Sequence, residues 1–219
     1  MKVLITGSTG MVGKSVLLEC LEHEEISEIT LINRSQIGFS HLKTREIIHS
    51  NFIDFNPIYD QLENYDACFH CMGVSSLGMN EADYSKITFD ITKSLADILY
   101  KKNPNMVFNY VSGTATDRSE QGTLMWARVK GKTENYIFNK GFKDAYAFRP
   151  GGILPEKGVK SKTGWVNFLY TVLKPFFSIL DGIMVRSSDF GMAMINSILR
   201  PQELKILENK DITLLSKIS

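Results

Sequence analysis

Short apolar runs alternate with amphipathic stretches along the first two thirds of this chain of 219 residues. Most runs are apolar almost throughout, which is typical of strands buried on both faces of a parallel sheet. We expect strands over residues 2–6, 28–32, 46–49, 67–72, 106–112 and 145–149. Apolar positions spaced three and four apart predict intervening helices over residues 11–22, 82–102 and 124–140. This alternation indicates an α/β fold of the Rossmann type, a doubly wound parallel sheet with helices on both faces.

The pattern changes at two places. Between residues 32 and 46 the chain carries Gly38 and polar residues without a helical stripe, so we expect a loop there. After residue 150 too few residues remain for an independent core. We therefore divide the chain into a Rossmann domain, residues 1–150, and a small C-terminal lobe, residues 151–219, that packs on it and serves the substrate. In the lobe we expect helices near residues 165–180 and 189–199 and a last strand near 205–208.

A glycine-rich turn joins the first expected strand to the first expected helix. Its sequence, TGSTGMVG over residues 6–13, has glycine where a dinucleotide-binding turn requires it. The first glycine permits a tight turn, the second lets the backbone approach a pyrophosphate, and the third lets the helix pack closely. Free N–H groups at the helix N-terminus then face the phosphates. The candidate cofactor-binding residues of this turn are Gly7, Thr9, Gly10, Met11, Val12 and Gly13.

The same turn also resembles the end of a P-loop, because Gly13-Lys14-Ser15 has the sequence of that motif's last three residues. A P-loop requires its first glycine at position 8, where this chain has Ser8. No convincing strand ending in aspartate is available to hold magnesium. The failed spacing therefore argues against hydrolysis of a nucleoside triphosphate.

The end of the second expected strand bears on the choice between NAD and NADP. NAD-binding folds place an acid there for the ribose 2′-hydroxyl, whereas this chain has Asn33 followed by Arg34 and Ser35. A carboxylate would repel a 2′-phosphate, and a guanidinium can bind it with paired hydrogen bonds. We therefore expect NADP, rather than NAD, as the cofactor. Asp54 and Phe55, which follow the third strand, are candidates for contacting adenine.

Composition and charge argue against several other classes of protein. The formal net charge of +1 gives no long-range attraction to nucleic acid or to an anionic membrane. The longest apolar stretch, residues 165–185, is interrupted by charged residues, so no integral membrane segment is expected. Three cysteines and an opening directly on a strand indicate a reducing, cytoplasmic location without a cleaved leader. Cys68 and Cys71 point to opposite faces of one expected strand, and no metal site is expected.

Three motifs together resemble the short-chain dehydrogenase/reductases, in particular their extended and atypical branches. They are the Thr-Gly-x-x-Gly-x-x-Gly turn, Val111-Ser112-Gly113 after the fifth strand and Arg149-Pro150-Gly151 after the sixth. The short second crossover and the short C-terminal lobe are similar to those of the Tat-interacting-protein-like, NAD(P)-binding members. Residues 125–131 lie where the superfamily has its Tyr-x-x-x-Lys motif. The resemblance covers nearly the whole chain.

The resemblance implies roles for individual residues. In the superfamily a serine positions the substrate, a tyrosine transfers a proton, and a lysine one helical turn later lowers the tyrosine pKa and holds the nicotinamide ribose. Ser112 and Lys130 match the serine and the lysine, but Trp126 replaces the tyrosine. An indole N–H donates a hydrogen bond and does not titrate, so it cannot be a general acid or base. The remaining candidate cofactor contacts, at or after strand ends and on this helix, are Cys71, Met72, Gly73, Lys130, Pro150 and Gly151.

Two functions stay open at this point. In one, another group such as Thr114 or Tyr84, or a water held by Ser112, supplies the proton, and the protein is an oxidoreductase or isomerase with an altered active site. In the other, the protein is a non-catalytic module that senses NADP(H) and acts through protein partners, as some relatives do. The sequence identifies neither the small-molecule substrate, nor a homodimer, nor a regulatory partner.

Overall fold

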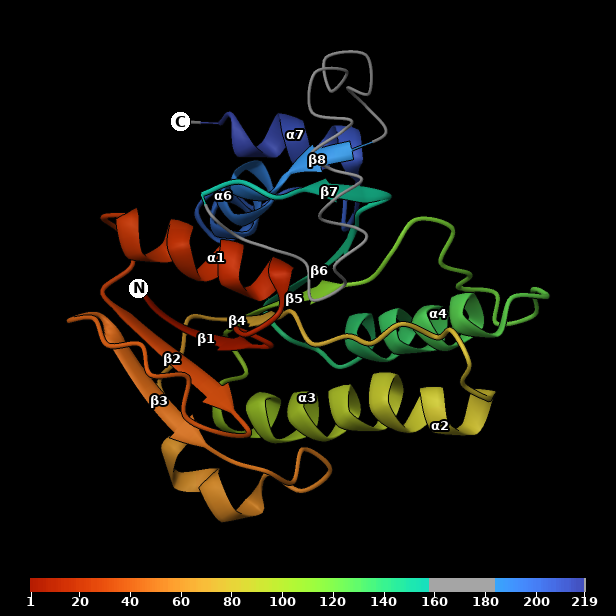
Figure 1. The fold of residues 1–219 in the computed structure, drawn as a ribbon, viewed down its shortest axis with the longest axis horizontal. Coiled ribbons are helices and arrows are strands. Elements are labelled where there is room, and N and C mark those ends of the chain that lie inside the picture. Colours follow the sequence, from red (N-terminus) through yellow and green to blue (C-terminus); the bar gives the residue numbers. More distant parts are fainter. Residues whose placement is uncertain (158–183, 219) are drawn as a thin grey trace.

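A seven-stranded, fully parallel sheet forms the centre of the molecule in the computed structural model, which describes residues 1–157 and 184–218 (Figure 1). The strand order is β3-β2-β1-β4-β5-β6-β9. The strands are β1 (Lys2–Thr6), β2 (Glu28–Asn33), β3 (Thr44–Ile48), β4 (Ala67–His70), β5 (Val107–Val111), β6 (Asp144–Arg149) and β9 (Ile206–Glu208). This order confirms the expected Rossmann-type fold. The order reverses between β1 and β4, and open α/β sheets bind ligands beyond the carboxyl ends of the strands at such a point.

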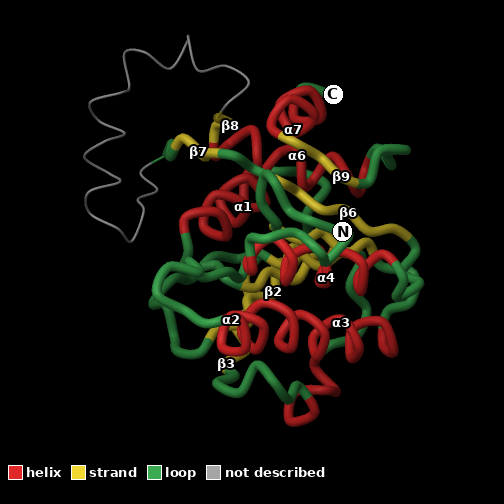
Figure 2. Tube along the Cα trace, turned by 90° about the vertical axis from the view of Figure 1, so that its right-hand side faces the viewer, coloured by secondary structure: helices red, strands yellow, loops and turns green. Residues whose placement is uncertain are grey.

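Helices cover both faces of the sheet, as expected. On one face α1 (Met11–Glu22) packs against α6 (Ser187–Leu199), and α7 (Asn209–Ser216) packs on α6. On the other face lie α3 (Ile91–Lys102) and α4 (Met125–Phe138). Figure 2 shows the strands between these two layers. Alternate residues along the strands feed two separate apolar cores, one for each face, because the strands are buried on both sides.

The helix expected over residues 82–102 is one continuous segment of three parts. It consists of α2 (Glu81–Ser85), a π-helical turn η2 (Lys86–Asp90) and α3. The segment begins at Asn80, whose side chain accepts a hydrogen bond from the amide of Asp83 at 2.9 Å. Single π-helical turns inside α-helices occur frequently at functional sites. Here the turn contains Ile87, which lines the cleft described below.

The connections and the C-terminal part differ in several details from the expectation. The segment between β2 and β3 is a loop, as expected, and a 3-10 helix η1 (Asn56–Gln61) follows β3. The expected helix over 189–199 is α6, and the expected strand over 205–208 is β9. The expected helix over 165–180 lies outside the described residues. The elements that the sequence pattern missed are β7 (Gly152–Leu154) and β8 (Met184–Arg186), which pair in parallel as a small second sheet, and α7.

None of the helices within the described ranges, 1–157 and 184–218, is long and apolar enough to cross a membrane.

Candidate functional site

The glycine loop between β1 and α1 lies directly against the end of β4. Gly7 has a φ angle of +74°, and a Cβ there would lie 2.7 Å from the carbonyl oxygen of Cys71. A Cβ on Gly13 would lie 2.2 Å from the carbonyl oxygen of Gly7. The amide of Gly10 donates to that same oxygen at 2.9 Å. A side chain at position 7 would therefore push the turn away from the end of β4, and one at position 13 would push the helix away from the turn, which is the physical reason for glycine at both.

A cleft of about 310 Å³ opens between the ends of β1, β2 and β4, where the strand order reverses. Eight of the seventeen predicted cofactor residues line it, namely Gly7, Thr9, Gly10, Asn33, Arg34, Cys71, Met72 and Gly73. The other lining residues were not predicted from the sequence; they are Ile32, Ser50, Phe52, Val74, Ile87 and Ile91. Ile87 and Ile91 belong to the apolar stripe of the helical segment. In the sequence they look like ordinary core residues, and only the structure places them, in and directly after the π-helical turn, at the cleft.

The end of β2 contributes two residues with different surroundings. Asn33 is buried, accepts a hydrogen bond from Ser8 Oγ at 2.8 Å and donates one to Glu46 Oε1 at 2.6 Å. Arg34 lines the cleft and is exposed, with no hydrogen-bond or ion-pair partner among the residues that the structure describes. Ser35 follows it and is also exposed. The guanidinium is therefore free to meet an anion, whereas the amide beside it is already engaged.

The two residues expected to contact adenine are not part of the cleft lining. Phe55 is only 1% exposed and packs in the core beneath α3. The Asp54 carboxylate accepts a hydrogen bond from the amide of Asn56 at 2.9 Å. The reason is the turn after β3, where His49 Nε2 lies 2.6–2.8 Å from two backbone carbonyl oxygens of the loop and holds it folded. Phe52, three residues earlier, lines the cleft in place of Phe55.

Met11, Val12 and Gly13 follow the cleft-lining loop in the first turn of α1. The first two side chains pack partly buried against the core below that helix, so only their backbone faces the loop region. They remain candidates through their N–H groups, because the N-terminus of a helix favours anions.

Ser112, at the end of β5, is buried and hydrogen-bonded within its own loop. Its Oγ lies 2.9 Å from Thr116 Oγ1, and Thr116 Oγ1 donates to the carbonyl oxygen of Gly113 at 2.7 Å. Thr116 has a single hydroxyl proton, so Ser112 must be the donor between the two hydroxyls. The sequence predicted a role for Thr114 and none for Thr116. Both threonines follow the strand closely, so their positions in the sequence do not show which of them contacts Ser112.

The two alternative proton donors named from the sequence are both occupied or closed off. Thr114 is exposed, and its hydroxyl lies 3.2 Å from both the Arg149 carbonyl oxygen and Glu208 Oε2. Tyr84 is only 2% exposed, and burial raises its pKa. Neither residue presents a free titrating group to an incoming substrate.

The loops after β5 and β6 meet at the same edge of the sheet. The amide of Thr114 donates to the carbonyl oxygen of Pro150 at 3.3 Å, and the amide of Gly151 donates to Asn209 Oδ1 at 3.0 Å. Pro150 and Gly151 therefore join the β5 loop to the start of α7. They do not line the 310 Å³ cleft.

The helix α4 carries Trp126 and Lys130 one turn apart, both partly buried. Lys130 Nζ lies 5.6 Å from the centre of the Tyr110 ring and has no hydrogen-bond or ion-pair partner in the described part of the chain. Burial lowers the pKa of Lys130 to about 8. Glu134, one turn further, cannot neutralise it fully because it is bound by Arg149 through two hydrogen bonds of 2.9 and 2.6 Å.

His70, at the end of β4, is a buried structural group. Thr92 Oγ1 donates its proton to the Thr88 carbonyl oxygen at 2.6 Å, so it accepts from His70 Nε2 at 2.9 Å. His70 Nδ1 then accepts from Thr6 Oγ1 at 2.7 Å. Burial, assisted by nearby Lys130, lowers the pKa of His70 to about 3. The neutral ring thus ties the end of β1 to the helical segment beside the cleft.

The three cysteines are free thiols, and burial raises the pKa of each. Among the residues of known placement, no group of three His, Cys, Asp or Glu side chains could hold a metal ion.

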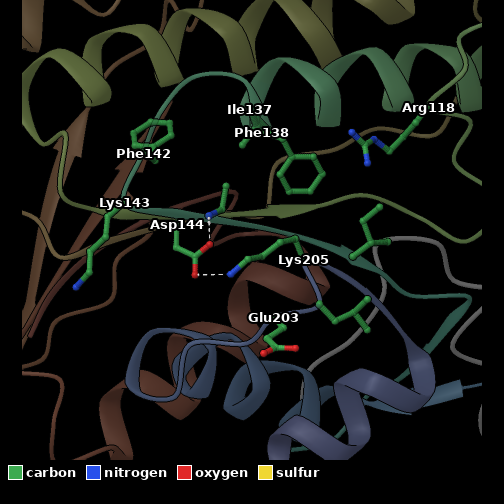
Figure 3. Close-up of a pocket in the computed structure, with 11 residues that line it drawn as sticks. Arg118, Ile137, Phe138, Phe142, Lys143, Asp144, Glu203 and Lys205 are labelled. Carbon is green, nitrogen blue, oxygen red and sulfur yellow. Dashed lines mark hydrogen bonds and ion pairs between the residues drawn. The ribbon is translucent and has the colours of Figure 1, made fainter.

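A larger hollow, of about 530 Å³, lies at the opposite edge of the sheet, beside the starts of β6 and β9 (Figure 3). Three of its five charged side chains, those of Arg118, Asp144 and Lys205, are engaged with one another or with nearby polar groups. Asp144 pairs with Lys205 at 2.7 Å, and Arg118 Nε donates to Asn135 Oδ1 at 2.7 Å. Ligands of parallel sheets bind at the carboxyl edge, so the smaller cleft is the candidate site.

Comparison with known proteins places this geometry in a family. The profile of the NAD dependent epimerase/dehydratase family matches residues 3–130, more than half of the chain. The chain belongs to this family. The matched residues of this epimerase/dehydratase family include the glycine loop, the whole cleft and the helix turn that carries Trp126 and Lys130. The resemblance to the extended short-chain dehydrogenase/reductases is thereby confirmed.

Individual proteins are similar to this chain in sequence or, for the solved structures, in fold. The chain is similar to Protein HTATIP2 of Rattus norvegicus, with 26% identity over 99% of this chain and 90% of the relative. Protein FMP52, mitochondrial, of Kluyveromyces lactis is 27% identical over 72% of this chain and 69% of its own length. Among solved structures, ADP-L-glycero-D-manno-heptose-6-epimerase of Helicobacter pylori has a TM-score of 0.70 at 16% identity, covering 95% of this chain and 76% of that one. The Bordetella bronchiseptica enzyme WbmH, in complex with NAD+, has a TM-score of 0.68 at 15% identity, covering 94% and 74%.

Proposed function

We propose that the chain binds NADP(H) in the cleft between the ends of β1, β2 and β4. The observation that carries the proposal is this cleft, which lies at the reversal of strand order and is lined by Gly7, Gly10 and Arg34. The helix α1 begins at Met11, directly after the loop, and its free N–H groups and dipole favour a pyrophosphate there. Titles of structural neighbours that name NAD+ or NAD support a nicotinamide dinucleotide as the ligand.

The preference for NADP over NAD rests on Arg34. Its guanidinium is exposed at the cleft, without a partner in the described residues, and can form paired hydrogen bonds with a 2′-phosphate. Ser35 follows Arg34 in the chain and Ser50 lines the same cleft, and their hydroxyls offer further hydrogen-bond donors. The acid that would bind a ribose 2′-hydroxyl in an NAD site is replaced by Asn33, whose amide is already engaged.

For the chemistry, we propose an oxidoreductase or isomerase with an altered active site, acting on a small molecule between the cofactor and the C-terminal lobe of residues 151–219. Ser112 and Lys130 support this reading, because both lie where the family places its serine and lysine. The partly buried Lys130 amine has no compensating partner in the described residues, so it lowers the stability of the fold. A functional role, either holding the nicotinamide ribose or transferring a proton, would account for its presence. Its pKa of about 8 suits either task.

A second candidate function is sensing of NADP(H) without turnover, with signalling through a protein partner or a second copy of the chain. The observation that favours it is Trp126, which cannot exchange a proton. The closed-off Tyr84 and the engaged Thr114 supply no evident replacement. In either case we propose a reducing compartment such as the cytoplasm, in keeping with the free cysteines.

The test of the cofactor proposal is the substitution Arg34→Glu, with NADPH and NADH titrated by energy transfer from tryptophan to the reduced nicotinamide. We expect NADPH affinity to fall by roughly 10- to 150-fold, the worth of a hydrogen bond to a charged group, while NADH affinity changes little. The matched control is Arg200→Glu, which reverses the charge of an exposed arginine at the end of α6. Equal NADPH and NADH affinities in both the wild type and Arg34→Glu would contradict the assignment of Arg34.

A further inference from the structure

The Asn33 side chain links the glycine loop to β3. It is 5% exposed, its Oδ1 accepts from Ser8 Oγ at 2.8 Å, and its Nδ2 donates to Glu46 Oε1 at 2.6 Å. An ionised carboxylate only accepts hydrogen bonds, so Glu46 fixes which way round the amide lies. Position 33 must therefore offer a donor to β3 and an acceptor to the loop at the same time. Of the ordinary side chains this size, only an amide does both.

Glu46 also reaches the loop that carries Arg34. Its Oε1 accepts a second hydrogen bond from the amide of Ile37 at 3.3 Å. The carboxylate stands on β3, where Glu46 pairs with Leu31 in the register of the parallel sheet, two residues before the end of β2. The acid is thus held one strand away from the position that an NAD site gives to its acid, and it is oriented toward Asn33 and the chain after Arg34.

We infer that Glu46 is a specificity-determining residue of the cofactor site, because it fixes position 33 as an amide and thereby leaves recognition at the ribose 2′-position to Arg34. The inference rests on the proposed binding of NADP(H). Glu46 is a positioning residue, since it acts through Asn33 and the loop and is not among the residues that line the cleft.

The inference has a specific consequence for converting the site to NAD. Asn33→Asp alone would set two carboxylates against each other at a buried contact that now measures 2.6 Å, with no proton donor between them. The loop would be displaced and both dinucleotides would bind less well. Glu46→Gln in addition restores a donor, because the new amide can donate to the carboxylate introduced at position 33, which still accepts from Ser8. The NH2 group that faces position 33 then gives up the longer, 3.3 Å bond from the Ile37 amide.

The experiment compares wild type, Asn33→Asp, Glu46→Gln and the double variant, each by melting temperature and by titration with NADPH and NADH. For Asn33→Asp we expect the melting temperature to fall by about 5 °C, because one unsatisfied buried polar contact has an effect of this size in a chain of this length. We also expect weaker binding of both dinucleotides. Glu46→Gln alone should change little, because its amide oxygen still accepts from Asn33. The double variant should regain most of the melting temperature and shift the NADPH-to-NADH affinity ratio at least ~10-fold toward NADH.

Two results would overturn the inference. The first is that the Asn33→Asp variant keeps the wild-type melting temperature and prefers NADH although Glu46 is unchanged. The other is a double variant that is no better than Asn33→Asp in either measurement. A wild type that binds neither dinucleotide would instead overturn the proposed function and the role of Glu46 in selectivity, and the four melting temperatures would still decide whether positions 33 and 46 are coupled.

Discussion

The two halves of the site are built in different ways. The half made by β1, β2 and β4 depends on backbone, since its glycines allow the close approach of the turn to α1 and β4. The half made by β5 and α4 also has one close backbone approach, since a Cβ on Gly131 would lie 1.7 Å from the carbonyl oxygen of Asp117. The chemistry that we propose for this half nevertheless rests on single side chains, Ser112 and Lys130, with Trp126 where the resemblance implies a proton-transferring tyrosine. A backbone site tolerates no side chain at its glycines, whereas a side-chain site can lose one function and keep its shape. On the proposed function, this contrast would allow cofactor binding to persist while the chemistry changes.

The halves also differ in how their polar groups are satisfied. On the cofactor side His70 is bonded at both ring nitrogens, and Asn33 is bonded through both ends of its amide. On the catalytic side Lys130 Nζ has no partner among the described residues, although burial lowers its pKa. Buried groups that are fully bonded are held in place before any ligand arrives, whereas the exposed Arg34 of the same half is left without a partner in the described residues. On the proposed catalytic side, the Lys130 amine is thus left without a hydrogen-bond or ion-pair partner in the described residues.

The largest expected effect is on the backbone half. Gly13→Ala places a Cβ 2.2 Å from the carbonyl oxygen of Gly7, so the loop or the helix must move. We expect a loss of about 3 kcal/mol in the free energy of unfolding and loss of NADPH binding. Urea denaturation followed by fluorescence measures the first. Gly113→Ala is the control, since a Cβ at position 113 meets nothing within 4 Å, and it should leave stability nearly unchanged.

If Gly13→Ala were as stable as Gly113→Ala, the cofactor half would not depend on close backbone packing, and the contrast between the halves would fail.

The next effect is on the catalytic half and has the opposite sign. Burial lowers the pKa of Lys130 to about 8 in the folded state, against about 10.4 when unfolded, so the unfolded chain binds more protons between these values. Wild-type stability should therefore rise as the pH increases from about 8 to 10.4. Lys130→Met removes that penalty, and we expect it to be more stable at pH 7 by about 1–3 kcal/mol while binding NADPH less tightly.

Lys132→Met, at an exposed lysine on the same helix, is the control. Its Nζ lies 4.3 Å from the centre of the Phe89 ring, so the substitution should cost at most about 0.5–1 kcal/mol and should alter neither the pH slope nor NADPH binding. A less stable Lys130→Met with an unchanged pH slope would show that the amine already has a partner in the folded protein.

The smallest expected effect concerns turnover. Trp126→Tyr restores a titrating hydroxyl one turn before Lys130, and we expect NADPH-dependent reduction of a small panel of aldehydes and ketones to appear. The gain should be smaller than the ~10²-fold that a well-placed general acid contributes, because the surroundings are not adapted to it. Trp126→Phe removes the indole without adding a hydroxyl and serves as the control. Brisk turnover by the wild type, lost in Ser112→Ala, would point to a different proton donor and against sensing alone.

The sequence was sufficient for those parts in which local pattern determines structure. The strand over 2–6 and the helix over 11–22 have the expected limits, because a buried apolar run, a glycine turn and a helical stripe follow one another there. Ile206–Glu208 was also found, although it is short. The three-residue strands β7 and β8 were missed because so short a run has no readable period.

The site was predictable only as far as each residue's role depends on its neighbours in the chain. Phe52 and Phe55 are both core residues of one loop, and which of them also lines the cleft depends on the fold of that loop around His49. The link between Asn33 and Glu46 depends on the register of two parallel strands. Thr116 rather than Thr114 meets Ser112 because of the loop's turn. Such contacts are tertiary, and spacing in the sequence carries no signal for them.

The central claim is that the cleft at the end of β1 is an NADP(H) site selected by Arg34. The most direct measurement is a titration of the purified wild-type protein with NADPH and with NADH, followed by energy transfer and checked by calorimetry. The account predicts that NADPH binds at least ~10-fold more tightly than NADH, because one charge-assisted hydrogen bond to the 2′-phosphate contributes a factor of this size to the affinity. Equal or tighter binding of NADH, or binding of neither dinucleotide, would contradict it.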